Sequence, residues 1–142
     1  MSYANTEDMR QRYSDFELIQ LTNKNDPMPE AINPVVLNVA LNSASSVIDG
    51  YLAVRYSLPL STVPESLTGC ACVLARYSLE SGQATDQATA QYKATIKFLE
   101  GVSAGTVQLG PGTDGTNADN NDGALIESAG SVFARNKSKG FI

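Results

Sequence analysis

Three stretches of the chain repeat their apolar residues with the period of an α-helix, and they limit the possible folds more than any other feature. The stretches are residues 33–55, 64–81 and 85–104. Asn33 fits the N-cap of the first helix and Pro34 its first helical position. The pattern predicts a mostly α fold, a small helical bundle built around three main helices.

Shorter helical signals precede these three stretches. Asn5 or Thr6 fits the N-cap of a first short helix, and Ser14 followed by Glu17 has the spacing of a capping box. Residues 22–32 contain two prolines and are predicted to be a loop. We therefore expect one or two short N-terminal helices in addition to the three main ones.

Each main helix has a predicted inward face. In the first, the inward stripe is Leu37, Leu41, Ala44, Ile48 and Leu52, and Arg55 projects onto it. A polar stripe beside it consists of Asn38, Asn42, Ser45 and Asp49. The second helix is apolar around most of its circumference, so it is predicted to be central. Gly82 and Gly105 are the expected stops of the second and third helices.

Composition changes sharply after residue 109, which divides the chain into three parts. Residues 1–109 are predicted to form the helical domain. Residues 110–124 are rich in Gly, Asn and Asp and are predicted to be a flexible loop. Residues 125–142 contain short apolar pieces without a helical period, and Arg135, Lys137 and Lys139 are the only charges after Glu127. We expect this last part to be an extended C-terminal arm that docks on a neighbour, or else a frayed end.

Several function classes fit the sequence poorly. The chain has no histidine, which excludes Ser-His and Cys-His nucleophile pairs and His-based metal sites. A net charge of -5 argues against general nucleic-acid binding. Cys70 and Cys72 are expected to be buried thiols in a reducing compartment. The N-terminus is polar, unlike a signal peptide, and no apolar run is expected to approach membrane-spanning length.

Three weak motifs do not change this interpretation. Residues 110–115 spell G-x-G-x-x-G, but no helix is predicted after them, as a dinucleotide site requires. Residues 117–128 begin like a calcium loop but lack its glycine and its final glutamate. Asp49 with Asp86 or Glu80 has no spacing that favours a catalytic carboxylate pair. We therefore expect no catalytic, metal or cofactor site.

The remaining candidates are adhesive groups, because arginine and tyrosine are enriched at protein interfaces. The alternative is that these residues make contacts within the subunit. In that case Arg76 pairs with Glu80 at the i, i+4 spacing, Arg55 pairs with some carboxylate, and the tyrosines lie in the core. The predicted interface residues are Asp49, Tyr51, Arg55, Tyr56, Arg76, Tyr77, Phe133, Arg135, Lys137, Lys139, Phe141 and Ile142.

Two segments carry a resemblance to a known family. Residues 44–60 match A-x-x-x-I-D-G-Y-L-x-x-R-Y-x-L-P-L, and residues 75–79 match A-R-Y-x-L. Both patterns are similar to those of Mu-like bacteriophage head-completion, or head–tail connector, proteins. Further matches at residues 3–22 and 92–105 extend the resemblance over residues 3 to about 109. The loop at 110–124 is not matched, and the ending is only loosely similar.

The resemblance implies a structural virion protein and not an enzyme. Such a protein is a homo-oligomer, a ring of about twelve copies under the portal protein, closed by heterologous contacts. It would complete the DNA-filled head and offer a platform to a tail terminator or neck protein. Its basic C-terminal arm would pair with an acidic surface on the next subunit or on the portal, and Phe141-Ile142 would fill an apolar groove. Genomic DNA would pass its acidic channel without specific binding. It would lie in the virion neck, after assembly in the host cytoplasm, with no membrane partner. The alternatives are a small DNA-binding or regulatory helical protein and, third, an enzyme.

Overall fold

A computed structural model of the protein describes residues 2–110, which contain five helices and no strand. The helices are α1 (Thr6–Arg12), α2 (Asp15–Thr22), α3 (Pro34–Leu52), α4 (Glu65–Glu80) and α5 (Asp86–Ala104). The predicted mostly α fold, with three main helices after short N-terminal ones, is thus confirmed. The predictions for residues 111–142, most of the loop and the whole arm, lie outside the described residues.

Local capping explains where the helices begin. Asn5 and Asp8 form a complete capping box at α1, each side chain accepting from the other residue's backbone N–H at 2.9 Å. Ser14 Oγ accepts from the Glu17 N–H at α2, and Asn33 Oδ1 from the Val35 N–H at α3. Thr85 caps α5 in the same way. These contacts satisfy N–H groups that have no partner within the helix.

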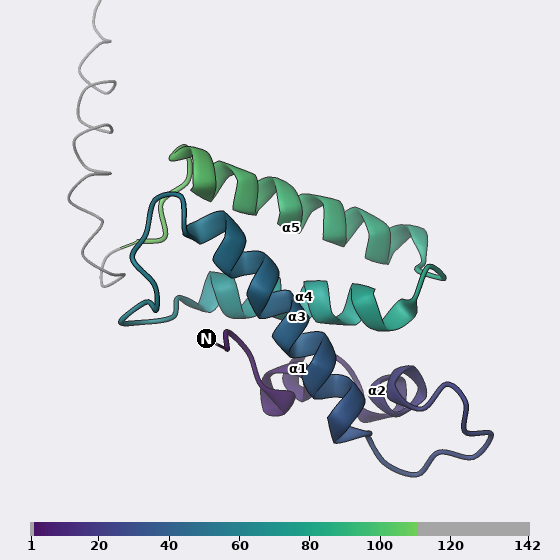
Figure 1. Ribbon diagram of the computed structural model, residues 1–142. Coiled ribbons are helices and arrows are strands. Elements are labelled where there is room, and N and C mark those ends of the chain that lie inside the picture. The colour runs from purple at the N-terminus through teal and green to yellow at the C-terminus, as the bar shows by residue number, and fades with distance from the viewer. Residues whose placement is uncertain (1, 111–142) are drawn as a thin grey trace, which may run out of the picture.

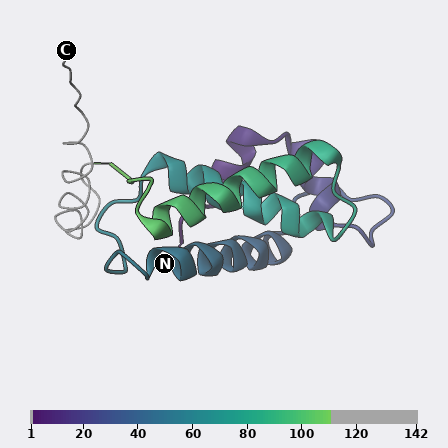
Figure 2. The same cartoon turned by 90° about the horizontal axis from the view of Figure 1, so that it is seen from above.

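The other helices pack on two sides of α4 (Figures 1 and 2). In Figure 1, α3 crosses in front of α4, and α5 lies along the upper edge of the molecule. Seen from above in Figure 2, α3 lies on one side of α4 and α5, with α1 and α2 on the other. Helix α4 contacts all four other described helices, and so does α3, so α4 shares its predicted central place with α3.

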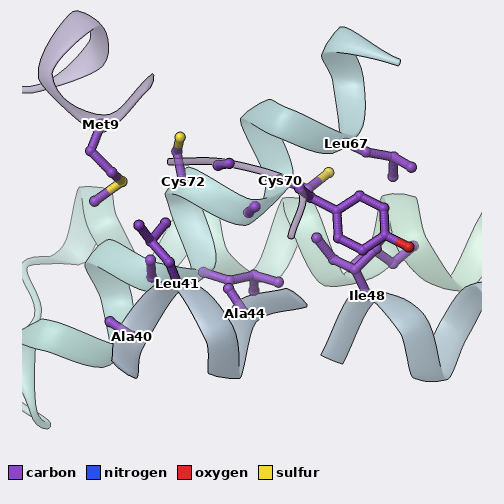
Figure 3. Packing of buried hydrophobic residues seen from close by; sticks show 14 of the residues in the cluster. Met9, Ala40, Leu41, Ala44, Ile48, Leu67, Cys70 and Cys72 are labelled. Atoms are coloured by element: carbon purple, nitrogen blue, oxygen red, sulfur yellow. The ribbon is translucent and has the colours of Figure 1, made fainter. Parts of the chain in front are cut away.

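The core is one apolar cluster shared by the helices (Figure 3). Met9 of α1, Leu41, Ala44 and Ile48 of α3, and Leu67, Cys70 and Cys72 of α4 all belong to it. All five residues of the predicted inward stripe of α3 are buried. The two cysteines are buried and free, as expected. Burial of this apolar surface is the main force that holds the short α1 and α2 against the longer helices.

The end of α3 differs from the prediction. The helix ends at Leu52 and not near Arg55, and in the turn that follows the N–H groups of Arg55 and Tyr56 both donate to the Leu52 carbonyl, at 3.0 and 2.8 Å. Arg55 therefore leaves the apolar stripe on which the helical period placed it. At the end of α4, Ser81 is the left-handed C-cap with φ 52°, and the expected Gly82 follows it with a positive φ of 84°. Gly105 ends α5 as predicted.

The expectation that no apolar run approaches membrane-spanning length was wrong. By length and composition, α3 is apolar enough to cross a membrane, and it is the one such helix among residues 2–110. Its inward stripe nevertheless packs in the core of the bundle, and core helices of globular proteins pass the same test. The high hydropathy of α3 therefore has two sources: its buried face and an outer face that also lacks charge.

Candidate interaction surface

The N-terminal segment is fastened to α3 by polar contacts. The Tyr3 hydroxyl donates to Asp49 Oδ1 at 2.5 Å, and the Tyr3 N–H donates to Ser45 Oγ at 3.2 Å. Burial, the hydrogen bond from Tyr3 to Asp49 and the charge of that carboxylate raise the pKa of Tyr3. Ser45 is therefore buried, not part of an outward polar stripe. Asp49, a predicted interface residue, has an internal partner.

Arg76 ties α4 to α2. Its guanidinium donates to Glu17 Oε2 through Nε at 2.7 Å and also through Nη2. It lies 5.0 Å from the centre of the Tyr13 ring and 3.7 Å from Glu80 Oε2. Burial lowers the pKa of Arg76, but the hydrogen bond and charge of Glu17 outweigh it and leave the pKa raised. The predicted partner Glu80 is thus the more distant of two carboxylates, and Arg76 has an internal structural role.

The turn after α3 is packed against the end of α5. A Cβ atom added to Gly105 would lie 2.8 Å from the Arg55 guanidinium carbon, so that side chain covers the glycine closely. Tyr56 is buried, and Tyr51 is partly buried against the core. These motif residues therefore lie at the junction of α3 and α5. Their predicted role between subunits stays a prediction.

Tyr77 of α4 stacks on Tyr92 of α5, with ring centres 4.0 Å apart and planes at 14°. The pair forms one wall of a hollow of about 220 Å³ whose opposite wall is α3, at Ser43 and Val47. Tyr77, one of the predicted interface residues, thus lines an apolar hollow on the surface. Its ring is therefore available both to the stack and to a partner.

The outer face of α3 carries no charge. Asp49 is the only charged residue in this helix of 19 residues, and it is held by Tyr3. Val35, Val39 and Val47 are nevertheless 69%, 60% and 42% exposed. Interface centres are depleted of charge, and contiguous exposed apolar surface marks interaction sites. This face is the strongest candidate for a contact surface among the described residues.

A groove runs along this face between α3 and α4. It consists of the hollow beside Tyr77 and a second hollow of about 300 Å³, and the two share Ser78. Val36 and Val39 line the second hollow, and Ser43 and Val47 line the first. We call this feature the α3–α4 groove. Leu21 of α2 and Lys24 of the loop after it also line the second hollow, so one charged side chain borders the groove. The groove can hold apolar side chains of a partner.

Sequence reasoning missed the valines and the groove. The available signal was the near absence of charge from residues 34–54, on the sides of the helix that do not belong to the inward stripe. Phe133, Arg135, Lys137, Lys139, Phe141 and Ile142, the other predicted interface residues, lie outside the described residues. Within residues 2–110, no group of His, Cys, Asp or Glu side chains is arranged to hold a metal ion.

Comparison with known proteins agrees with the motifs at residues 44–60 and 75–79, and it extends the likeness past the expected limit near residue 109 into the loop at 110–124. Residues 3–128 match the family model described as Bacteriophage Mu, Gp36. The chain is 45% identical over 140 residues to the Mu-like prophage FluMu protein gp36 of Haemophilus influenzae, an alignment that covers 99% of this chain and 98% of that protein. It is 39% identical over 147 positions to Gene product J of Escherichia phage Mu, across the full length of both proteins.

Proposed function

The chain belongs to the bacteriophage Mu Gp36 family, and from this premise we propose that it is a head–tail connector of a Mu-like phage. In this role, copies of the chain form a ring under the portal, complete the DNA-filled head and present a platform for the tail. Neighbouring subunits contact one another through different faces, as a closed ring requires. The protein is structural and performs no reaction.

The observation that carries the proposal is the uncharged outer face of α3 with its exposed valines. Exposed apolar surface without charge is typical of interaction sites, and a ring subunit would bury such a surface against its neighbour. The acidic net charge of -5 also fits a channel that DNA must pass without sticking, since like charges oppose phosphate binding. The same charge opposes the alternative of a DNA-binding regulator, which a salt-dependent shift assay with the purified chain would reveal.

The resemblance at residues 44–60 and 75–79 supports the connector role through the fold. Arg55, Tyr56 and Arg76 are motif residues, and each lies at a junction between helices. A motif that fixes the angles between α2, α3, α4 and α5 fixes the shape of the subunit. In a ring, small changes of shape accumulate around the circle, so such residues serve assembly without touching a neighbour.

The decisive experiment is the analysis of particles made without the protein. A phage or prophage with a stop codon early in this reading frame is expected to yield filled heads and separate tails that do not join. The wild-type particle is expected to contain the protein as a ring at the neck in electron micrographs. A chain truncated at Ser128 is expected to fold but not to complete heads. Mature particles that lack the protein would overturn the connector role.

A further inference from the structure

We propose that the α3–α4 groove binds the apolar pairs of the C-terminal segment, residues 132–142, of a neighbouring copy of this chain. The inference rests on the proposed ring and deepens it, because it names the surface that is covered and the segment that covers it. Three observations support it: the chemistry of the groove, the length of chain after residue 110 and the distribution of charge.

The groove and the segment match in chemistry. The α3 side of the groove presents Val36, Val39 and Val47, and the α4–α5 side presents the stacked Tyr77. The segment has two apolar pairs, Val132-Phe133 and Phe141-Ile142, separated by polar and basic residues. Two hollows that share Ser78 can take apolar side chains in sequence along one extended chain.

The length of chain after the described domain allows the contact. Gly-rich chains of about 30 residues span about 30 Å on average and can extend much further. Helix α3, with 19 residues, is about 28 Å long. Arg55 lies against Gly105, so the end of α3 is beside the end of α5, where the chain continues toward residue 110. A segment that begins there can reach the groove of a copy packed alongside.

Charge favours the same contact. Acidic side chains outnumber basic ones among residues 2–110, whereas Arg135, Lys137 and Lys139 are the last three charges of the chain. A basic segment is therefore attracted to the domain of any copy, and the apolar pairs on both sides of these bases decide where on that domain it binds. The valines and Tyr77 of the groove provide the apolar site, and the excess of acidic side chains in the domain as a whole provides the attraction, although Lys24 also lines one hollow.

Disulfide trapping in the full-length chain tests the inference. Val39→Cys and Phe141→Cys are placed in two separate chains, which are mixed under mild oxidation. Val39 is 60% exposed, so the fold should tolerate the change. The native Cys70 and Cys72 are buried and should not compete. We expect a heterodimer on mixing, and a ladder of oligomers from a chain that carries both changes. The matched control replaces Val39→Cys by Lys97→Cys on the exposed side of α5, where no trapping is expected.

The outcomes separate the inference from the proposed function. An internal disulfide in a chain that stays monomeric would show that the segment covers its own groove. Equal trapping by Lys97→Cys would show a non-specific encounter. Either result overturns the inference. The same cysteines in purified particles give the final check: particles that contain the protein without the Val39–Phe141 bond overturn the groove contact only, whereas particles without the protein overturn the connector role.

A second pair of variants does not depend on disulfide chemistry. Val39→Asp combined with Val47→Asp places two charges in the groove, and Val54→Asp places one on an exposed valine outside both hollows. We expect the groove variant to keep its helical circular dichroism and to lower the yield of joined particles at least about tenfold, since charge is excluded from interface centres. The Val54 variant should keep the wild-type yield. A groove variant with normal yield contradicts the inference.

Discussion

Arg76 of α4 donates two hydrogen bonds to one carboxylate oxygen of Glu17 on α2, a residue 59 positions earlier in the chain. This contact fixes the short α2 to the central helix. A helix of 8 residues has little stability of its own, so its place depends on such long-range contacts and on the core below it.

Removal of the Glu17 carboxylate should therefore destabilise the domain. Glu17→Ala leaves the partly buried Arg76 guanidinium with only the more distant Glu80, and we expect a loss of about 1–2 kcal/mol in the free energy of unfolding. Urea denaturation followed by circular dichroism measures it. Asp15→Ala is the control, because its pair with Arg10 is exposed to solvent. Equal effects of the two changes would show that the Arg76–Glu17 pair has no special role.

The raised pKa of Tyr3 predicts a loss of stability at high pH. The unfolded chain ionises Tyr3 near the ordinary value of 10.0, whereas the folded protein holds the proton to higher pH. The stabilisation is thus complete below pH 10 and is lost as pH rises above it. Tyr3→Phe should be less stable near neutral pH, because Asp49 loses its donor, and should show a shallower decline above about pH 10.

Urea midpoints of both proteins at about pH 9 and about pH 11 check this prediction. The difference between the two proteins isolates Tyr3 from the other groups that titrate in this range, such as Tyr13 and the two thiols. If the urea midpoints of the two proteins fell equally between these two pH values, the result would contradict the burial and hydrogen bonding of the Tyr3 hydroxyl.

The cysteines should be inert in the folded protein. Burial raises the pKa of Cys70 to about 11, and burial raises that of Cys72 to about 11 although the charge of Arg12 opposes it. Thiolate is the reactive form, so little of it is present at about pH 8. We expect alkylation with iodoacetamide to be slow in buffer and rapid in concentrated urea, as mass spectrometry would measure. Rapid labelling without urea would mean that the α4 face of the core opens readily.

Two glycine substitutions should have opposite effects on the stability of the fold. Gly105 has φ 89°, and an added Cβ would meet the Arg55 guanidinium at 2.8 Å. Gly105→Ala should therefore cost about 1–2 kcal/mol or more. Gly50 lies inside α3 with open space around it, and Gly50→Ala should stabilise by about 0.5–1 kcal/mol.

Melting temperatures of the two variants check these signs. The double change Gly105→Ala with Arg55→Ala relieves the steric contact but not the backbone strain, so it should recover only part of the lost stability. If the double variant recovered all of the lost stability, the whole cost of Gly105→Ala would come from the contact of the added methyl group with the Arg55 side chain.

Much of the fold could be predicted because helix boundaries are local. Asn5, Ser14 and Asn33 cap helices through N–H groups two or three residues away, and each was a predicted cap, with Thr6 as the alternative to Asn5. The inward stripe of α3 follows from its period alone. The central place of α4 followed from apolar residues around its circumference. Helical spacing predicted less where the partner lies far away in the sequence. It predicted the pair of Arg76 with Glu80, which exists, but it could not show that Glu17 lies nearer to Arg76.

The sequence by itself determined the helices, their caps, their buried stripes and membership of a phage family. Only the tertiary structure decided that Ser45 is buried under Tyr3, that Arg55 lies against Gly105, and that α3 and α4 leave an apolar groove between them. The physical reason is range. Caps and periodicity depend on atoms a few residues apart, whereas partners and grooves depend on the distances and angles at which whole helices pack.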